Sequence, residues 1–88
     1  MPLLKDILYK TGIEEVVGST EIEVKNICFD SRKAKEGSLF IANSGTKVDG
    51  HQFIEDVIKK GTIAIVCERF PEQMHKGITY VRVQDSAF

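Results

Sequence analysis

Two short polar stretches, residues 30–33 and 43–49, carry the side chains that could bind a ligand. Their hydrogen-bonding groups are the hydroxyls of Ser31, Ser44 and Thr46, the cations of Arg32 and Lys47, and the backbone N–H groups around Gly45. Hydroxyls, amides and cations suit an anionic, hydroxyl-rich ligand, since each charge-assisted hydrogen bond contributes roughly 1.5–3 kcal/mol. The residue types therefore indicate binding of a nucleotide or a sugar phosphate.

The same residues offer no group that would make or break a bond. The chain contains no GxxxxGK[ST] phosphate loop, and its two histidines, His51 and His75, have no Cys or His neighbour at ligand spacing. Cys28 and Cys67 lie inside apolar runs and are expected to be buried thiols. We predict no catalytic residue and no metal or other cofactor site in this chain.

Each polar residue also has an ordinary structural role to set against binding. Asp30 and Arg32 could pair or cap a turn, which local sequence favours over ligand contact. Ser31 and Thr46 are evenly balanced between turn stabilisation and recognition, and Lys47 is by default a solvated lysine.

Hydrophobic spacing predicts the elements that position these stretches. Apolar residues repeat on one side of two helices, one starting at Pro2 and one capped by Asp49. Short apolar runs predict strands over 24–29, 38–42, 62–67 and 78–83, the last with Tyr80 and Arg82 on opposite faces. A strand, a helix and a strand in succession predict parallel pairing, which would bring the two polar stretches to one edge of the sheet.

Length and composition set the class of protein. Eighty-eight residues form one domain, for which we predict an α/β fold with a mixed, partly parallel sheet and packed helices. A net charge of −1 provides no field for nucleic acid or membrane partners, and the first ten residues resemble neither a signal peptide nor a membrane span. We expect a cytoplasmic protein. Asp85 suggests a helix cap close to the last residue, so a fragment of a longer protein is expected.

An ordered set of short motifs resembles the N-terminal domain of the Mur ligases of peptidoglycan synthesis. The motifs follow in the order Asp30-Ser31-Arg32, EGSLFIA over 36–42, Gly45, Asp49-Gly50-His51, and Gly61 before IAIV over 63–66. The resemblance implies that residues 1–88 hold the uridine diphosphate end of a UDP-N-acetylmuramoyl-peptide. Within the family, the chain most resembles the branch that adds the third stem-peptide residue, meso-diaminopimelate or lysine.

The resemblance also implies individual roles. The substrate contacts would fall on Phe29, Ser31, Thr46, Lys47 and Val48, with Arg32 and Gly45 in support. A central domain using ATP and Mg²⁺ and a C-terminal domain would be separate parts of the full-length enzyme, which would form an amide bond. Two alternatives stay open: the branch that adds D-alanyl-D-alanine, and a non-catalytic regulatory module like the N-terminal domain of HPr kinase.

Overall fold

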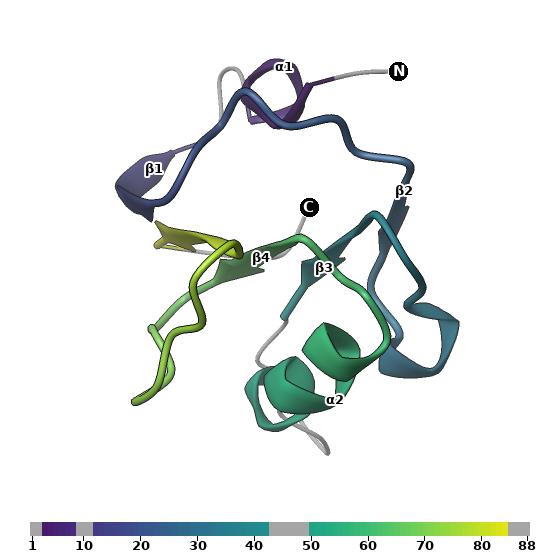
Figure 1. Ribbon diagram of the computed structural model, residues 1–88. Helices are drawn as coiled ribbons and strands as arrows, with labels where there is room; N and C mark the ends of the chain where they lie inside the picture. The colour runs from purple at the N-terminus through teal and green to yellow at the C-terminus, as the bar shows by residue number, and fades with distance from the viewer. Residues whose placement is uncertain (1–2, 9–11, 43–49, 85–88) are drawn as a thin grey trace.

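A computed structural model describes residues 3–8, 12–42 and 50–84 of the chain. Its elements are two α-helices, two 3₁₀ helices and five strands, in the order α1 (Leu4–Ile7), β1 (Ile13–Val17), β2 (Asn26–Cys28), η1 (Ser31–Lys33), β3 (Ser38–Ile41), η2 (Gly50–Phe53), α2 (Ile54–Lys59), β4 (Ala64–Cys67) and β5 (Thr79–Val83). Figure 1 shows them as a sheet with α1 and α2 on opposite sides.

The five strands form one mixed sheet in the order β1-β5-β4-β3-β2. The four strands β2 to β5 are parallel to one another, and β1 pairs antiparallel with β5. The α/β class, the mixed sheet and the parallel pairing around α2 are thus confirmed. Because β2 and β3 are adjacent and parallel, Cys28 lies opposite Phe40 and the carboxyl ends of both strands reach the same edge.

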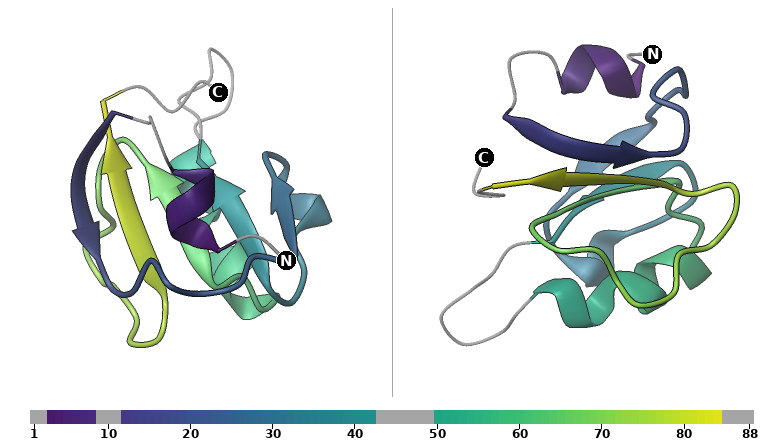
Figure 2. Two further views of the ribbon diagram at one scale, coloured as in Figure 1. Left: turned by 90° about the horizontal axis from the view of Figure 1, so that it is seen from above. Right: turned by 90° about the vertical axis from the view of Figure 1, so that its left-hand side faces the viewer.

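Each face of the sheet is covered by one helix, as the right-hand view in Figure 2 shows. Leu4 and Leu8 of the α1 segment pack with Leu39, Val66 and other buried aliphatic residues. On the other face, Ile54 and Val57 of α2 pack with a second buried cluster that includes Phe40, Ile65 and Tyr80. Covering on both faces explains why β3 and β4 are continuous apolar runs without polar alternation.

One strand was missed by the sequence analysis, and two predictions about the elements need correction. β1 was not predicted, because four of its five residues are exposed and give no apolar alternation. β2 is shorter than the predicted strand over 24–29. Tyr80 and Arg82 lie on the same face of β5, since residues two apart in a strand point the same way; Tyr80 packs with the α2 cluster, whereas Val81 and Val83 pack with α1.

The helix predicted after Asp49 begins with the 3₁₀ turn η2 and becomes α-helical at Ile54. The Asp49 and Asp85 caps lie outside the described residues. Cys28 and Cys67 are buried free thiols, as predicted. No helix in the described part of the chain is long and apolar enough to cross a membrane.

Candidate functional site

The candidate site lies at the carboxyl edge of the parallel strands, where β2 leads into η1. Phe29 follows β2 directly and is 51% exposed, an unusual state for a phenylalanine. Ser31 is the first residue of η1 and is partly buried. Open α/β sheets bind ligands at this edge, so an exposed aromatic ring and a hydroxyl there form a candidate recognition surface.

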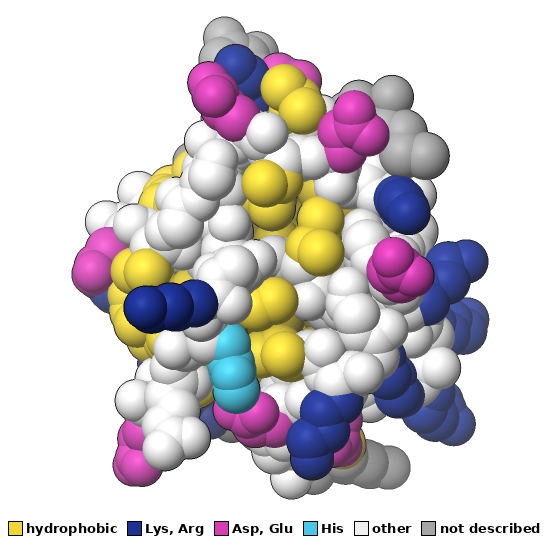
Figure 3. Space-filling view, viewed as in Figure 1, with side chains coloured by type: hydrophobic (Ala, Val, Ile, Leu, Met, Phe, Trp, Pro, Cys, Tyr) yellow, Lys and Arg dark blue, Asp and Glu magenta, His cyan; other side chains and the backbone are white. Residues whose placement is uncertain are grey.

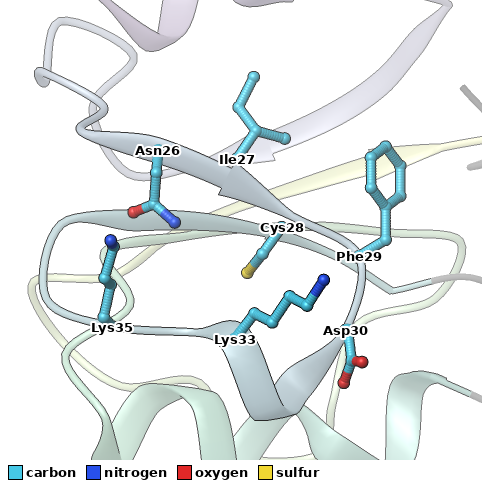
Figure 4. A pocket seen from close by; sticks show the side chains of 7 residues that line it. All are labelled: Asn26, Ile27, Cys28, Phe29, Asp30, Lys33 and Lys35. Carbon is cyan, nitrogen blue, oxygen red and sulfur yellow. The ribbon is translucent and has the colours of Figure 1, made fainter.

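An apolar cavity of about 320 Å³ lies between the end of the α1 segment and the sheet beside Phe29. Its lining residues are all apolar: Ile7, Leu8, Ile27, Phe29, Leu39, Ile41 and Val66. Ile27 is 46% exposed, and Figure 4 shows its side chain and that of Phe29 pointing away from Cys28. The flat face of a ligand ring such as a nucleobase could stack there against the Phe29 ring, with the polar ring edge turned toward solvent or toward Ser31.

A wider, more polar groove of about 600 Å³ lies on the other side of β2, between that strand and the connection to β3 (Figure 4). It is lined by residues 26–30, Lys33 and Lys35. Figure 3 shows Lys and Arg side chains gathered on the right-hand side, where Figure 1 places β2 and this connection. The surroundings of the candidate site are therefore positive although the whole chain carries a net charge of −1.

Asp30 and Arg32 form a tight local pair rather than two free ligand groups. The Asp30 carboxylate accepts hydrogen bonds from the Arg32 backbone N–H at 2.9 Å, from Nε at 3.1 and 3.2 Å, and from Nη2 at 2.8 Å. These hydrogen bonds lower the pKa of Asp30 to about 2. The pairing that the local sequence favoured is confirmed, and it shapes the turn that presents Ser31.

The two thiols have the environment of structural rather than reactive cysteines. Burial raises the pKa of Cys28, and it raises the pKa of Cys67 to about 11. Both side chains are therefore protonated thiols at neutral pH, whereas a reactive cysteine needs the thiolate.

Three of the seven predicted site residues lie on one described connection: Phe29, Ser31 and Arg32. The other four, Gly45, Thr46, Lys47 and Val48, lie outside the described residues. Their segment follows β3, whose carboxyl end is next to that of β2.

Sequence reasoning missed the apolar lining from Ile7, Leu8 and Ile27. Ile7 and Leu8 belong to the apolar side of the helix predicted to start at Pro2, and Ile27 lies within the strand predicted over 24–29; neither element was linked to the site. Alternation along 26–29 gives the available signal, because it places Ile27 and Phe29 on the same face.

The described residues contain no group of three or more His, Cys, Asp or Glu side chains that could hold a metal ion. The donor set at the edge of the sheet is made of hydroxyl, cationic and aromatic groups. It therefore fits an organic anion rather than a bare Mg²⁺ ion, and we assign no ATP or Mg²⁺ contact to a residue of this chain.

Comparison with known proteins gives consistent matches in sequence. Residues 23–87 match the family model described as "Mur ligase family, catalytic domain". The UDP-N-acetylmuramoyl-L-alanyl-D-glutamate--2,6-diaminopimelate ligase of Cytophaga hutchinsonii is 49% identical over 85 residues, covering 96% of this chain and 18% of that protein. The ligase of the same name from Bacteroides fragilis is 40% identical over 83 residues, covering 94% of this chain and 17% of that protein.

Solved structures of Mur ligases share the fold. MurF from Acinetobacter baumannii matches with a TM-score of 0.66 and 32% identity, over 75% of this chain and 14% of that one. MurF from Thermotoga maritima, solved in complex with ADP, matches with a TM-score of 0.62 and 28% identity, over 72% of this chain and 14% of that one. The chain thus spans less than a fifth of the length of the relatives it matches.

The family model covers most of the chain, and the ordered motifs from Asp30 to Val66 lie within it. The fold, with its mixed five-stranded sheet, agrees with the solved relatives. The chain therefore belongs to the Mur ligase family.

Proposed function

We propose that this chain is the substrate-holding domain of a ligase that adds diaminopimelate to UDP-N-acetylmuramoyl-L-alanyl-D-glutamate in peptidoglycan synthesis. In this proposal the domain binds the uridine diphosphate end of the substrate. The observation that carries it is the half-exposed Phe29 beside an apolar cavity, two residues before the Ser31 hydroxyl at the carboxyl edge of the sheet. Choice of the amino acid rests on the names of the two similar ligases.

Each part of the nucleotide has a proposed counterpart. The uracil ring lies in the cavity against Phe29, and Ser31 hydrogen-bonds to the nucleotide. Thr46, Lys47 and Val48 supply further contacts from the segment after β3, with the backbone around Gly45. Arg32 shapes the first loop through its pair with Asp30. The positive surroundings with Lys33 and Lys35 favour approach of the diphosphate.

The rest of the reaction is assigned to other parts of a longer protein. ATP and Mg²⁺ would activate the substrate carboxylate in a central domain, and a C-terminal domain would bring the amino acid. The whole enzyme would act in the cytoplasm. Within this chain, the residues only bind and orient the nucleotide.

A titration of the ¹⁵N-labelled chain with UDP and with UDP-N-acetylmuramic acid tests the proposal. We expect amide shift changes centred on residues 29–32 and 46–48. Absence of binding at millimolar ligand, or changes confined to other residues, would overturn it and would favour a regulatory module.

Ser31→Ala should lower the affinity for UDP roughly three- to ten-fold through the lost hydrogen bond. The matched control is Ser19→Ala, because Ser19 lies near the start of β5, at the opposite edge, where its carbonyl accepts from Thr79 Oγ1 at 2.6 Å. Equal affinities of the two variants would remove Ser31 from the site.

A further inference from the structure

A lysine from a distant element holds the loop that carries Ser31. Lys60 Nζ, at the end of α2, donates a hydrogen bond to the Ser31 carbonyl oxygen at 2.8 Å. The two residues are 29 positions apart in the sequence. The same carbonyl oxygen accepts from the Ala34 N–H at 3.3 Å, so the ammonium group is added to the hydrogen bond that closes η1.

The end of α2 is a fixed support for this contact. Lys60 N–H donates to the Val57 carbonyl at 3.1 Å, and Gly61 N–H donates to the Ile58 carbonyl at 3.0 Å. The Gly61 carbonyl in turn accepts from Gly37 N–H at 3.0 Å. The end of α2 is thus hydrogen-bonded to the connection from β2 to β3 at two points. One is Ser31, near the beginning of the connection, and the other is Gly37, at its end.

The neighbouring lysine provides a contrast. Lys59 is exposed in the same last turn of α2, but it makes no hydrogen bond or ion pair with the described residues through its side chain. Both lysines carry the same charge and are exposed at adjacent positions at the end of α2. A difference between them therefore reports the contact with Ser31 rather than the general field.

We propose that Lys60 is a positioning residue for nucleotide binding, which it serves by holding the Ser31 loop through the backbone carbonyl. This inference rests on the proposed function. Lys60 itself touches no ligand in this proposal; it lowers the number of conformations that the loop samples before the ligand arrives. A preorganised loop binds more tightly because less ordering remains to be done on binding.

The test is a UDP titration of the unmodified chain and of Lys60→Met, Lys60→Arg and Lys59→Met. We expect Lys60→Met to lower the affinity about three- to ten-fold, Lys60→Arg to restore most of it, and Lys59→Met to leave it unchanged. Thermal unfolding of each variant should show that the order of the melting temperatures differs from the order of the UDP affinities. Equal affinities of Lys60→Met and Lys59→Met, or losses that simply follow melting temperature, would overturn the inference.

Two further measurements separate positioning from direct charge attraction. If Lys60 acts through Ser31, the loss in Lys60→Met should be similar at low and high ionic strength, and it should be smaller in a Ser31→Ala background. A loss that disappears at high salt, or one that is fully additive with Ser31→Ala, would contradict the positioning role. Failure of the unmodified chain to bind UDP would overturn the proposed function as well, whereas the other outcomes concern Lys60 alone.

Discussion

The Asp30–Arg32 pair is a conspicuous polar motif whose groups bond to each other within the turn that leads into the candidate site. The carboxylate caps η1 by accepting the Arg32 N–H and also holds the guanidinium in a two-pronged contact. With its acceptor atoms occupied in this way, Asp30 is poorly suited to bind a phosphate, which it would repel. Its contribution is to fix the turn geometry on which Ser31 is placed.

The pKa of Asp30 offers a residue-scale prediction. Arg32→Gln should raise the pKa of Asp30 from about 2 toward its ordinary value of 3.8, because the side-chain hydrogen bonds from Arg32 are the largest cause of the lowering. The backbone N–H of residue 32 remains, so part of the lowering should persist. A ¹³C NMR titration of the carboxyl group measures the change.

Lys33→Gln is the matched control, since the charge of Lys33 is the smallest cause of the shift and should change the Asp30 pKa far less. Because the folded state lowers this pKa, the pair contributes to stability above pH 3.8, and that contribution is lost as the pH falls through about 2. Equal shifts in the two variants would contradict the assigned hydrogen bonds.

At the scale of elements, the junction between α2 and the β2–β3 connection determines where the candidate site lies. Gly61 has a φ of +101°, and a Cβ at this position would lie 2.8 Å from the Glu36 Cα. Only glycine allows the chain to leave α2 in this direction while the backbone of the connection passes so close. The same residue bonds to Gly37, so the turn and the connection are fixed together.

Gly61→Ala should therefore lower the free energy of unfolding by at least about 2 kcal/mol, from backbone strain plus displacement of the Glu36 backbone. Gly77→Ala is the control, because Gly77 has a φ of +84° but open space around its Cβ position. Its cost should be about 1 kcal/mol, from strain alone. Urea denaturation of both variants measures the difference, and equal losses would contradict the importance of the close approach to Glu36.

Across the domain as a whole, the sheet separates a buried, stabilising interior from the exposed edge where the candidate site lies. Two phenylalanines illustrate the division: Phe40 on the inner strand β3 is 1% exposed, and Phe29 after the edge strand β2 is 51% exposed. Phe40 packs in the cluster beneath α2, whereas Phe29 lines the open cavity near α1. The same side chain should therefore serve folding at one position and binding at the other.

Phe40→Ala should lower the free energy of unfolding by about 3–5 kcal/mol, a large part of the total stability of an ordinary domain. Phe29→Ala should cost less than about 1 kcal/mol, since half of the side chain is already in water, but it should weaken UDP binding. Chemical denaturation and UDP titration of both variants give the comparison. A large stability loss for Phe29→Ala with unchanged affinity would assign that ring to the core.

The amino-acid sequence was enough to predict the α/β class, the parallel pairing around α2, the buried thiols and the family. These follow from local information: apolar runs covered on both faces, a one-sided helix between two strands, and motifs in a fixed order. The local sequence also favoured pairing of Asp30 with Arg32 over contact of either residue with a ligand, because side chains two residues apart in a turn can reach each other.

The side chains that surround the candidate site could be identified only from the three-dimensional arrangement of the chain. Strand β1 is held by pairing with β5, far away in the sequence, so its own residues gave no signal. The cavity beside Phe29 is lined by residues from the α1 segment and from strands β2, β3 and β4. Lys60 contacts Ser31, which is 29 positions away in the sequence. Such contacts depend on the order of strands and on the placement of helices over them, which no local pattern of residues specifies.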